Sequence, residues 1–170
     1  MKRSSLASWF LASSVLFSGV ANAAMTLVDV GEYANFFYDP ATIKRNGSIV
    51  TVWEVVTYKN YVEAKGRHVK SSRVRVAFDC KNEQYQTQYN GAVSERDGEG
   101  QLIEAYNYGL DAKWEIIDPA TTTYVVFALA CSGKSLPKPL ADLNAKFQKH
   151  QISESEYQAK RDAYLKTLKQ

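Results

Sequence analysis

The chain has few of the residues that most catalytic and metal sites need. Its 170 residues include only two histidines and two cysteines. His68 and His150 have no cysteine, histidine or carboxylate neighbours at the spacing of metal ligands, so we expect both on the surface. The G-x-S-x-G pattern of serine hydrolases and the glycine-rich phosphate-binding loop are absent. We therefore expect a protein that is not an enzyme and that holds no metal or other cofactor.

Carboxylates leave one catalytic alternative open. Two carboxyl groups that folding brings together can act as acid and base in hydrolysis, and the sequence alone does not show which ones meet. The candidates are Glu54, Asp79, Glu83 and Glu104. An enzyme with such a dispersed site is therefore kept as a third hypothesis, behind two non-enzymatic ones.

A long hydrophobic run is found only near the N-terminus. Lys2 and Arg3 precede an apolar stretch, residues 6–20, and the small residues of Ala21-Asn22-Ala23 follow it, which is the order of a secretory signal peptide. The stretch of about 15 residues is shorter than the roughly 20 that a membrane-spanning helix needs. We expect cleavage between Ala23 and Ala24 and no transmembrane segment afterwards. Because Ala24 is not the cysteine of a lipoprotein, we expect a periplasmic or secreted protein without a lipid anchor.

Strong charge of one sign is also lacking. The net charge is +3, of which residues 1–23 contribute +2, residues 24–136 contribute −2 and residues 137–170 contribute +3. A nucleic-acid-binding protein would show a clustered basic patch, so we expect no nucleic-acid partner. The basic C-terminal segment suits an ordinary solvated helix, or contact with anionic lipid or polysaccharide.

The two cysteines predict one disulfide. Apolar residues alternate with polar ones before Cys80, and an alternating apolar set also precedes Cys131, so we expect each cysteine to end the apolar face of its own strand. An even cysteine count in an exported chain favours a bond between them. A redox pair is the alternative, but it usually has the C-x-x-C spacing, which these residues lack.

Short segments rich in β-branched and aromatic residues, separated by turn signals, predict an antiparallel sheet of about six strands. Residues 59–70 are expected to be a charged loop, and Asp39-Pro40 is expected to end the first strand. The expected strands are residues 33–38, 48–58, 71–81, 84–89, 102–108, a short one within 113–119, and 121–131.

The composition changes after Cys131. Residues 133–139 have the glycine, serine and proline content of a linker, and helix formers dominate from there to the end. Ser153 and Glu156 fit a capping box, with Ile152 and Tyr157 placed to pack across it. A helical hairpin, about 140–149 and 154–168, is thus expected to follow a β domain at 24–132, which makes the fold class α+β. An apolar stripe formed by Tyr157, Tyr164, Leu165 and Leu168 should pack on the sheet, on the other helix or on another subunit.

One face of the predicted sheet is a candidate binding surface. The polar face of the strand at 71–81 carries Arg73 and Arg75, and Tyr85 and Tyr89 alternate with glutamines on the next strand. Tyrosine suits binding surfaces because its ring provides contact area while its hydroxyl stays hydrated. The 11 tyrosines also fit a plainer interpretation, since tyrosine is a good strand residue.

Several short motifs in a fixed order resemble the surface-adhesin protein E family. They are Phe37-Tyr38-Asp39, Val52-Trp53-Glu54, residues 72–80, residues 114–119 (Trp-Glu-Ile-Ile-Asp-Pro) and Cys131. The resemblance covers about residues 27–132 and implies a mostly antiparallel sheet from Gram-negative envelope proteins. The founding member of that family is an outer-membrane lipoprotein that binds host vitronectin and laminin. Residues 140–168 are similar to a short C-terminal helical domain of bacterial proteins, which implies an interaction or oligomerisation element.

Two hypotheses follow for function. The first is an envelope protein whose adhesin-like domain recognises a protein, for example one of the extracellular matrix, or a polysaccharide. The second is a periplasmic structural or assembly protein that self-associates through its C-terminal helices, for example as a homodimer.

Overall fold

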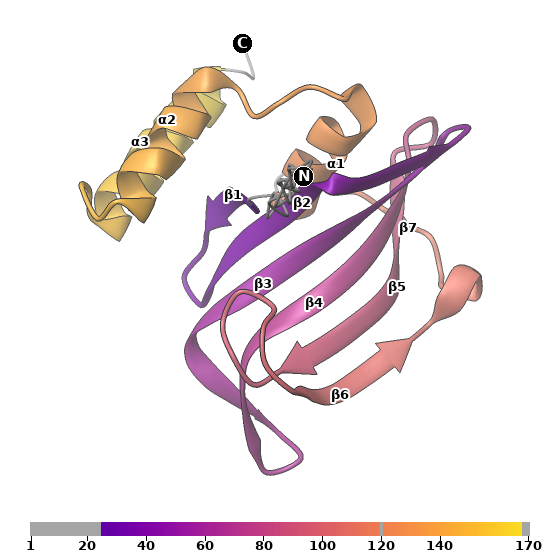
Figure 1. The fold of residues 1–170 in the computed structure, drawn as a ribbon. Coiled ribbons are helices and arrows are strands. Elements are labelled where there is room, and N and C mark those ends of the chain that lie inside the picture. Colours follow the sequence, from indigo (N-terminus) through magenta and orange to yellow (C-terminus); the bar gives the residue numbers. More distant parts are fainter. Residues whose placement is uncertain (1–24, 120, 168–170) are drawn as a thin grey trace, which may run out of the picture.

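The computed structural model describes residues 25–119 and 121–167, with side chains up to Tyr164. Six consecutive strands form an antiparallel meander whose spatial order follows the chain (Figure 1). A short seventh strand pairs with the beginning of β5. The strands are β1 Thr26–Val30, β2 Ala34–Asn46, β3 Ile49–Ala64, β4 Arg67–Asp79, β5 Gln84–Val93, β6 Leu102–Asn107 and β7 Glu115–Ile116.

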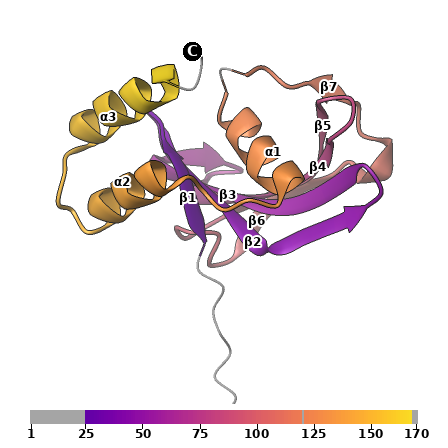
Figure 2. The same cartoon turned by 90° about the horizontal axis from the view of Figure 1, so that it is seen from above.

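Three α-helices follow the sheet, which confirms the predicted α+β class. They are α1 Thr122–Ser132, α2 Lys138–Gln148 and α3 Glu154–Thr167, and a single 3-10 turn, η1 Gly109–Asp111, lies between β6 and β7. Viewed from above, α1 covers one face of the sheet, while α2 and α3 lie beside β1 (Figure 2). No helix in the described ranges is long and apolar enough to cross a membrane. The predicted signal peptide and cleavage site lie outside the described residues.

The prediction that residues 121–131 form a strand was wrong, because they form α1. The alternating apolar set before Cys131 suggested a strand, but most residues between its members are apolar or small as well, so this period is not distinctive. The caps decide: the Thr121 side chain accepts a hydrogen bond from the Tyr124 N–H, and Gly133 ends the helix in the left-handed conformation at a φ of 67°. On β2, the Arg45 guanidinium donates to the carbonyls of Ala130 and Cys131 at the helix C-terminus.

One expected loop and one expected strand end are in fact strand. The charged segment at 59–70 continues β3 and β4 into a long hairpin, in which Val62 pairs with Val69. Pro40 does not end the first strand, because it lies in a bulge of β2 between the paired residues Asp39 and Lys44. There the Thr42 hydroxyl accepts the Trp53 N–H in place of a ladder partner.

The main core lies between α1 and the sheet face that we call the α1 face. Its strand residues are Val50, Val52, Val76 and Phe78, all buried. The Phe127 ring of α1 meets the Phe78 ring edge-on, with 5.8 Å between centroids. These side chains alternate with residues of the opposite face, which α1 leaves uncovered.

A disulfide joins Cys80 and Cys131, as predicted, although Cys131 lies in the last turn of α1 and not in a strand. Cys80 follows β4 directly, and the two Cα atoms are 5.6 Å apart. The bond therefore fastens the C-terminal end of α1 to the end of β4.

The helical hairpin docks on β1. Tyr157 of α3 is fully buried against Leu27, Val30 and Leu143. Its hydroxyl donates a 2.7 Å hydrogen bond to the side chain of Asn144, which in turn donates to the Leu27 carbonyl. Burial raises the pKa of Tyr157 to about 12, so this donor keeps its proton over any physiological pH.

The N-terminus of α3 has the predicted cap. The Ser153 hydroxyl accepts the Glu156 N–H, and Ile152 packs in the same cluster as Tyr157. The side chains of Leu165 and Leu168, which belong to the predicted apolar stripe, lie outside the described residues.

Removing the disulfide should destabilise the protein. The bond closes a loop of 51 residues, which in the chain-entropy model corresponds to about 4 kcal/mol of lost unfolded-state freedom. We expect Cys80→Ala with Cys131→Ala to lower the free energy of unfolding by about 2–4 kcal/mol in urea titrations. Wild-type protein under reducing conditions is the matched control and should behave alike. An unchanged urea midpoint would show that α1 is held by packing alone.

Removing the Tyr157 hydroxyl should weaken the docking of the hairpin. Tyr157→Phe leaves the Asn144 oxygen buried without that donor, at a cost of about 1–3 kcal/mol in urea unfolding. The control is Tyr33→Phe, since Tyr33 is 76% exposed, and it should leave the midpoint unchanged. Equal midpoints for the two variants would contradict the proposed role of this buried pair.

Candidate functional site

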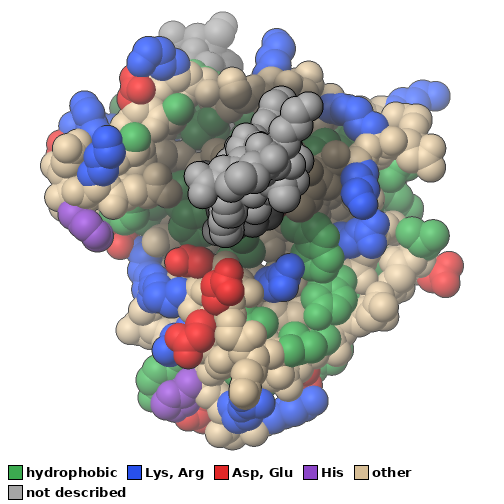
Figure 3. Space-filling view, viewed as in Figure 1, with side chains coloured by type: hydrophobic (Ala, Val, Ile, Leu, Met, Phe, Trp, Pro, Cys, Tyr) green, Lys and Arg blue, Asp and Glu red, His purple; other side chains and the backbone are tan. Residues whose placement is uncertain are grey.

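The face opposite α1 carries a row of large side chains across three central strands. The register pairs Trp53 of β3 with Arg75 of β4, and Arg75 with Tyr89 of β5. Arg73 lies on the same face, two residues before Arg75. We call Trp53, Arg73, Arg75 and Tyr89 the arginine–aromatic face. Figure 3 shows Lys or Arg side chains beside hydrophobic ones over the middle strands of this side of the molecule.

Trp53 contacts two of the other three side chains, and Arg75 is its register neighbour on β4. The guanidinium carbon of Arg73 lies 5.5 Å from the centre of the Trp53 ring, within the range of a cation–π interaction. The Tyr89 ring meets Trp53 edge-on, with 5.5 Å between centroids. Gly91 makes room for that tyrosine, because a Cβ there would lie only 2.6 Å from the Tyr89 hydroxyl.

Both arginines keep their charge available. Among the described residues, no ion pair involves Arg73 or Arg75, and both side chains are exposed. Trp53 and Tyr89 are partly buried, so their rings are held in place while part of each stays accessible. The arrangement offers flat apolar contact area together with two cationic forks that fit carboxylate, sulfate or phosphate groups.

A folded loop, residues 94–101, closes one end of this face. The Ser71 hydroxyl donates to the Glu95 carbonyl and accepts the Gly98 N–H, and the Thr57 hydroxyl donates to Asp97. Gly98 lies over Arg73 and Val55, where a Cβ would meet each at 3.1 Å. The loop therefore sets one boundary of the accessible surface.

Three of the four residues predicted as a binding surface lie together, and one does not. Tyr85 points to the α1 side, where it packs against the core and its hydroxyl donates to Glu115 at 3.2 Å. Trp53, the residue that organises the group, was missed. Alternation along this strand could not have found it, because Val55 on the same side is buried while the charged Glu54 lies on the α1 side.

The carboxylates considered for catalysis do not form a recognisable dyad. Glu104 forms an ion pair with Lys65 at 2.9 Å, Asp79 accepts hydrogen bonds from the turn at 81–82, and Glu83 lies in that turn with a φ of 53°. His68 stacks on Tyr61 and His150 is exposed at the end of α2. Within 25–119 and 121–164, no three His, Cys, Asp or Glu side chains gather as metal ligands.

Glu54 differs from the other carboxylates because it faces the α1 side. Its register partners are Tyr38 and Val74, and its Oε1 atom is buried with no hydrogen-bond partner among the described residues. Burial raises the pKa of Glu54 to about 7, so the carboxyl is substantially protonated near neutral pH.

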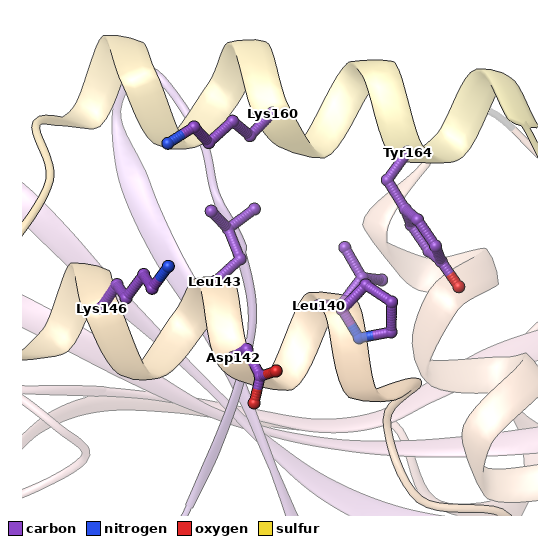
Figure 4. Close-up of a pocket in the computed structure, with 7 residues that line it drawn as sticks. Leu140, Asp142, Leu143, Lys146, Lys160 and Tyr164 are labelled. Carbon is purple, nitrogen blue, oxygen red and sulfur yellow. The ribbon is translucent and has the colours of Figure 1, made fainter.

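Two surface hollows are present near the helical hairpin. The smaller, about 380 Å³, lies between α2 and α3, where Lys146 and Lys160 flank Leu143 (Figure 4). Lys160 forms an ion pair with Glu156. The larger, about 800 Å³, runs between Tyr38, Leu136 and Ala145. Neither hollow brings together groups that suggest a reaction.

Comparison with known families identifies the β domain. The family described as surface-adhesin protein E matches residues 26–132, which is more than half of the chain. This chain belongs to the surface-adhesin protein E family. The match confirms the resemblance inferred from residues 27–132. No curated protein matches the chain.

Solved structures show the same fold. Crystal form II of Haemophilus influenzae protein E is 21% identical with a TM-score of 0.50, covering 62% of this chain and 92% of that one. Protein E from non-typeable Haemophilus influenzae is 20% identical with a TM-score of 0.50, covering 78% and 92%. At these identities the likeness supports the fold and not individual binding residues.

The buried carboxyl of Glu54 should make the free energy of unfolding depend on pH. Its pKa in the folded protein is about 7, above the ordinary value of 4.5, so the folded state holds this proton more tightly than the unfolded state. The resulting contribution to the free energy of unfolding is complete below pH 4.5 and is lost as pH rises through 7. We expect the urea midpoint of the wild type to fall from pH 5 to pH 8 relative to Glu54→Gln, which cannot ionise. The two histidines are common to both proteins and cancel in the comparison. Parallel pH profiles would contradict the burial of this carboxyl.

Proposed function

We propose that this protein is an exported, non-enzymatic binding protein whose arginine–aromatic face recognises a protein or polysaccharide ligand. The observation that carries the proposal is the contact group of Trp53, Arg73 and Tyr89, with Arg75 beside it, on the one sheet face that α1 leaves open. Membership of an adhesin family supports a binding role.

The composition of this face indicates the chemistry of the ligand. Tryptophan, tyrosine and arginine dominate the energetics of protein interfaces because they combine apolar area with directed hydrogen bonds. Two guanidinium groups that form no ion pair among the described residues favour a ligand that carries carboxylate or sulfate groups, which can accept two hydrogen bonds each. An acidic segment of a protein or an acidic polysaccharide satisfies both requirements.

Export is part of the same proposal. The N-terminal sequence predicts secretion, and the family's description as a surface adhesin supports a location outside the cytoplasm. The Cys80–Cys131 disulfide fits an oxidising compartment such as the periplasm.

The hypothesis of self-association through the C-terminal helices receives no support from the hairpin's packing. Leu143 and Tyr157, two large apolar side chains of the hairpin, are buried against β1 of the same chain. A homodimer stays a prediction that the structure does not test.

Neutralising the arginine pair should weaken ligand binding strongly. We expect Arg73→Gln with Arg75→Gln to lower retention on immobilised acidic polysaccharides or extracellular-matrix glycoproteins at least tenfold. The fold should be unchanged, because both side chains are exposed and outside the core. A matched control, Lys146→Gln with Lys149→Gln, removes the same charge from two exposed positions, one in the last turn of α2 and one at its C-cap.

Two results would overturn the proposal. If the wild type is retained by none of these materials, the binding role loses its support. If both double variants lose retention equally, general positive charge and not this face is responsible.

A further inference from the structure

Exposed apolar side chains gather along one edge of the sheet. Of the nine large hydrophobic residues that are exposed in the described part of the chain, five belong to β6, β7 and the turns beside them. Leu110 and Ile116 are each 80% exposed. The other three are Leu102, Tyr106 and Tyr108, each about half exposed. A concentration of this kind marks an interaction surface, whereas single exposed residues do not.

The strand at this edge has a free side. β6 is the last strand of the meander and pairs only with β5, so half of its backbone N–H and C=O groups face away from the sheet without a strand partner among the described residues. The opposite edge is treated differently. There the helical hairpin lies beside β1 (Figure 1). Its Asn144 and Gln158 side chains donate to the carbonyls of Leu27 and Val30.

β6 also lacks the residues that usually protect an edge strand from pairing with another chain. Its sequence from Leu102 to Asn107 contains no proline and no lysine or arginine. Its only charge, Glu104, is neutralised by an ion pair with Lys65. The Tyr106 and Tyr108 rings stack nearly parallel, 6.3 Å apart, at the end of the strand.

We propose that β6 is a docking edge, where an extended segment of a partner protein adds as a further strand and packs its apolar side chains on Tyr106, Tyr108 and Leu110. A free strand edge fits an extended polypeptide, because only another peptide backbone repeats donors and acceptors at the matching interval. Neither a polysaccharide nor a lipid offers that repeat.

The shape of the edge favours a single added strand over a second copy of this sheet. The turn η1 projects outward just after β6, and a register shift interrupts the pairing of β6 with β5 near Leu102 (Figure 1). A short peptide can end before the projecting turn, whereas a second rigid sheet would have to pass it. The β6 edge and the arginine–aromatic face are formed by different side chains, so each can be tested without the other.

The test uses the full chain, expressed with its own N-terminal segment and purified after export. A phage library of random 12-residue peptides is selected on it, and one enriched peptide is synthesised. We expect apolar residues at alternate positions of the enriched sequences. We also expect slower amide hydrogen exchange in residues 102–107 when the peptide is bound, and loss of binding when a proline replaces its central residue.

Matched variants separate this edge from other surfaces. Tyr108→Lys with Leu110→Lys should weaken peptide binding at least tenfold, because two charges then replace exposed apolar contacts. Tyr33→Lys makes the same kind of change at an exposed position in the turn between β1 and β2, at the opposite edge of the sheet, and should leave binding unchanged.

Each of four results would overturn the proposal. One is the absence of any enriched peptide. Another is a bound peptide that leaves exchange at residues 102–107 unchanged. The third is a peptide whose binding depends on Arg73 and Arg75 and not on Tyr108 and Leu110. The fourth is protection of β6 in the free protein that rises with concentration as the mass in solution doubles, which would assign the edge to a second copy.

Discussion

The attachment of α1 to one face of the sheet is the constraint on which the rest of the structure depends. A single antiparallel sheet needs a partner layer to bury its apolar side, and α1 supplies it with Phe127 and its neighbours. The Cys80–Cys131 bond and the Arg45 guanidinium hold the helix at its C-terminal end. Because α1 takes one face, the alternate residues of the same strands must face away from it, and there the chain has placed arginine and aromatic residues instead of a second core.

The two edges of the sheet differ in the same way as its two faces, since one is covered within the chain and one is not. The helical hairpin covers β1 with hydrogen bonds to its free carbonyls and buries Tyr157 against it. Nothing described covers β6, although its neighbourhood carries the most exposed apolar side chains of the sheet. One face and one edge are therefore closed within the chain, and one face and one edge are left to meet other molecules. The buried carboxyl of Glu54 belongs to the closed side, which makes it a matter of stability and not of recognition.

Much of this was predictable from the sequence, and the failures have identifiable physical causes. Alternation at residues 71–81 placed Arg73 and Arg75 correctly on a polar face, and the turn signals found most strands of the meander. Residues 121–131 were misassigned because the apolar residues at alternate positions up to Cys131 were interpreted as a strand period, although most residues between them are apolar or small as well. The caps at Thr121 and Gly133 held the missing information. Tyr85 was misplaced because a bulge between β4 and β5 puts it on the opposite face from Tyr89. Trp53 gains its importance from pairing across strands, which sequence spacing does not show.

Protection of Arg73 and Arg75 in a complex tests the central claim most directly, namely that the face opposite α1 meets the ligand. Phenylglyoxal modifies accessible guanidinium groups, and mass spectrometry reads the modification at each arginine. In the free protein both residues should react readily, since they are exposed and form no ion pair among the described residues. In complex with a retained polysaccharide or matrix glycoprotein, both should be protected, while Arg67 at the start of β4 keeps its reactivity. Undiminished modification of Arg73 and Arg75 in a saturated complex would contradict the account.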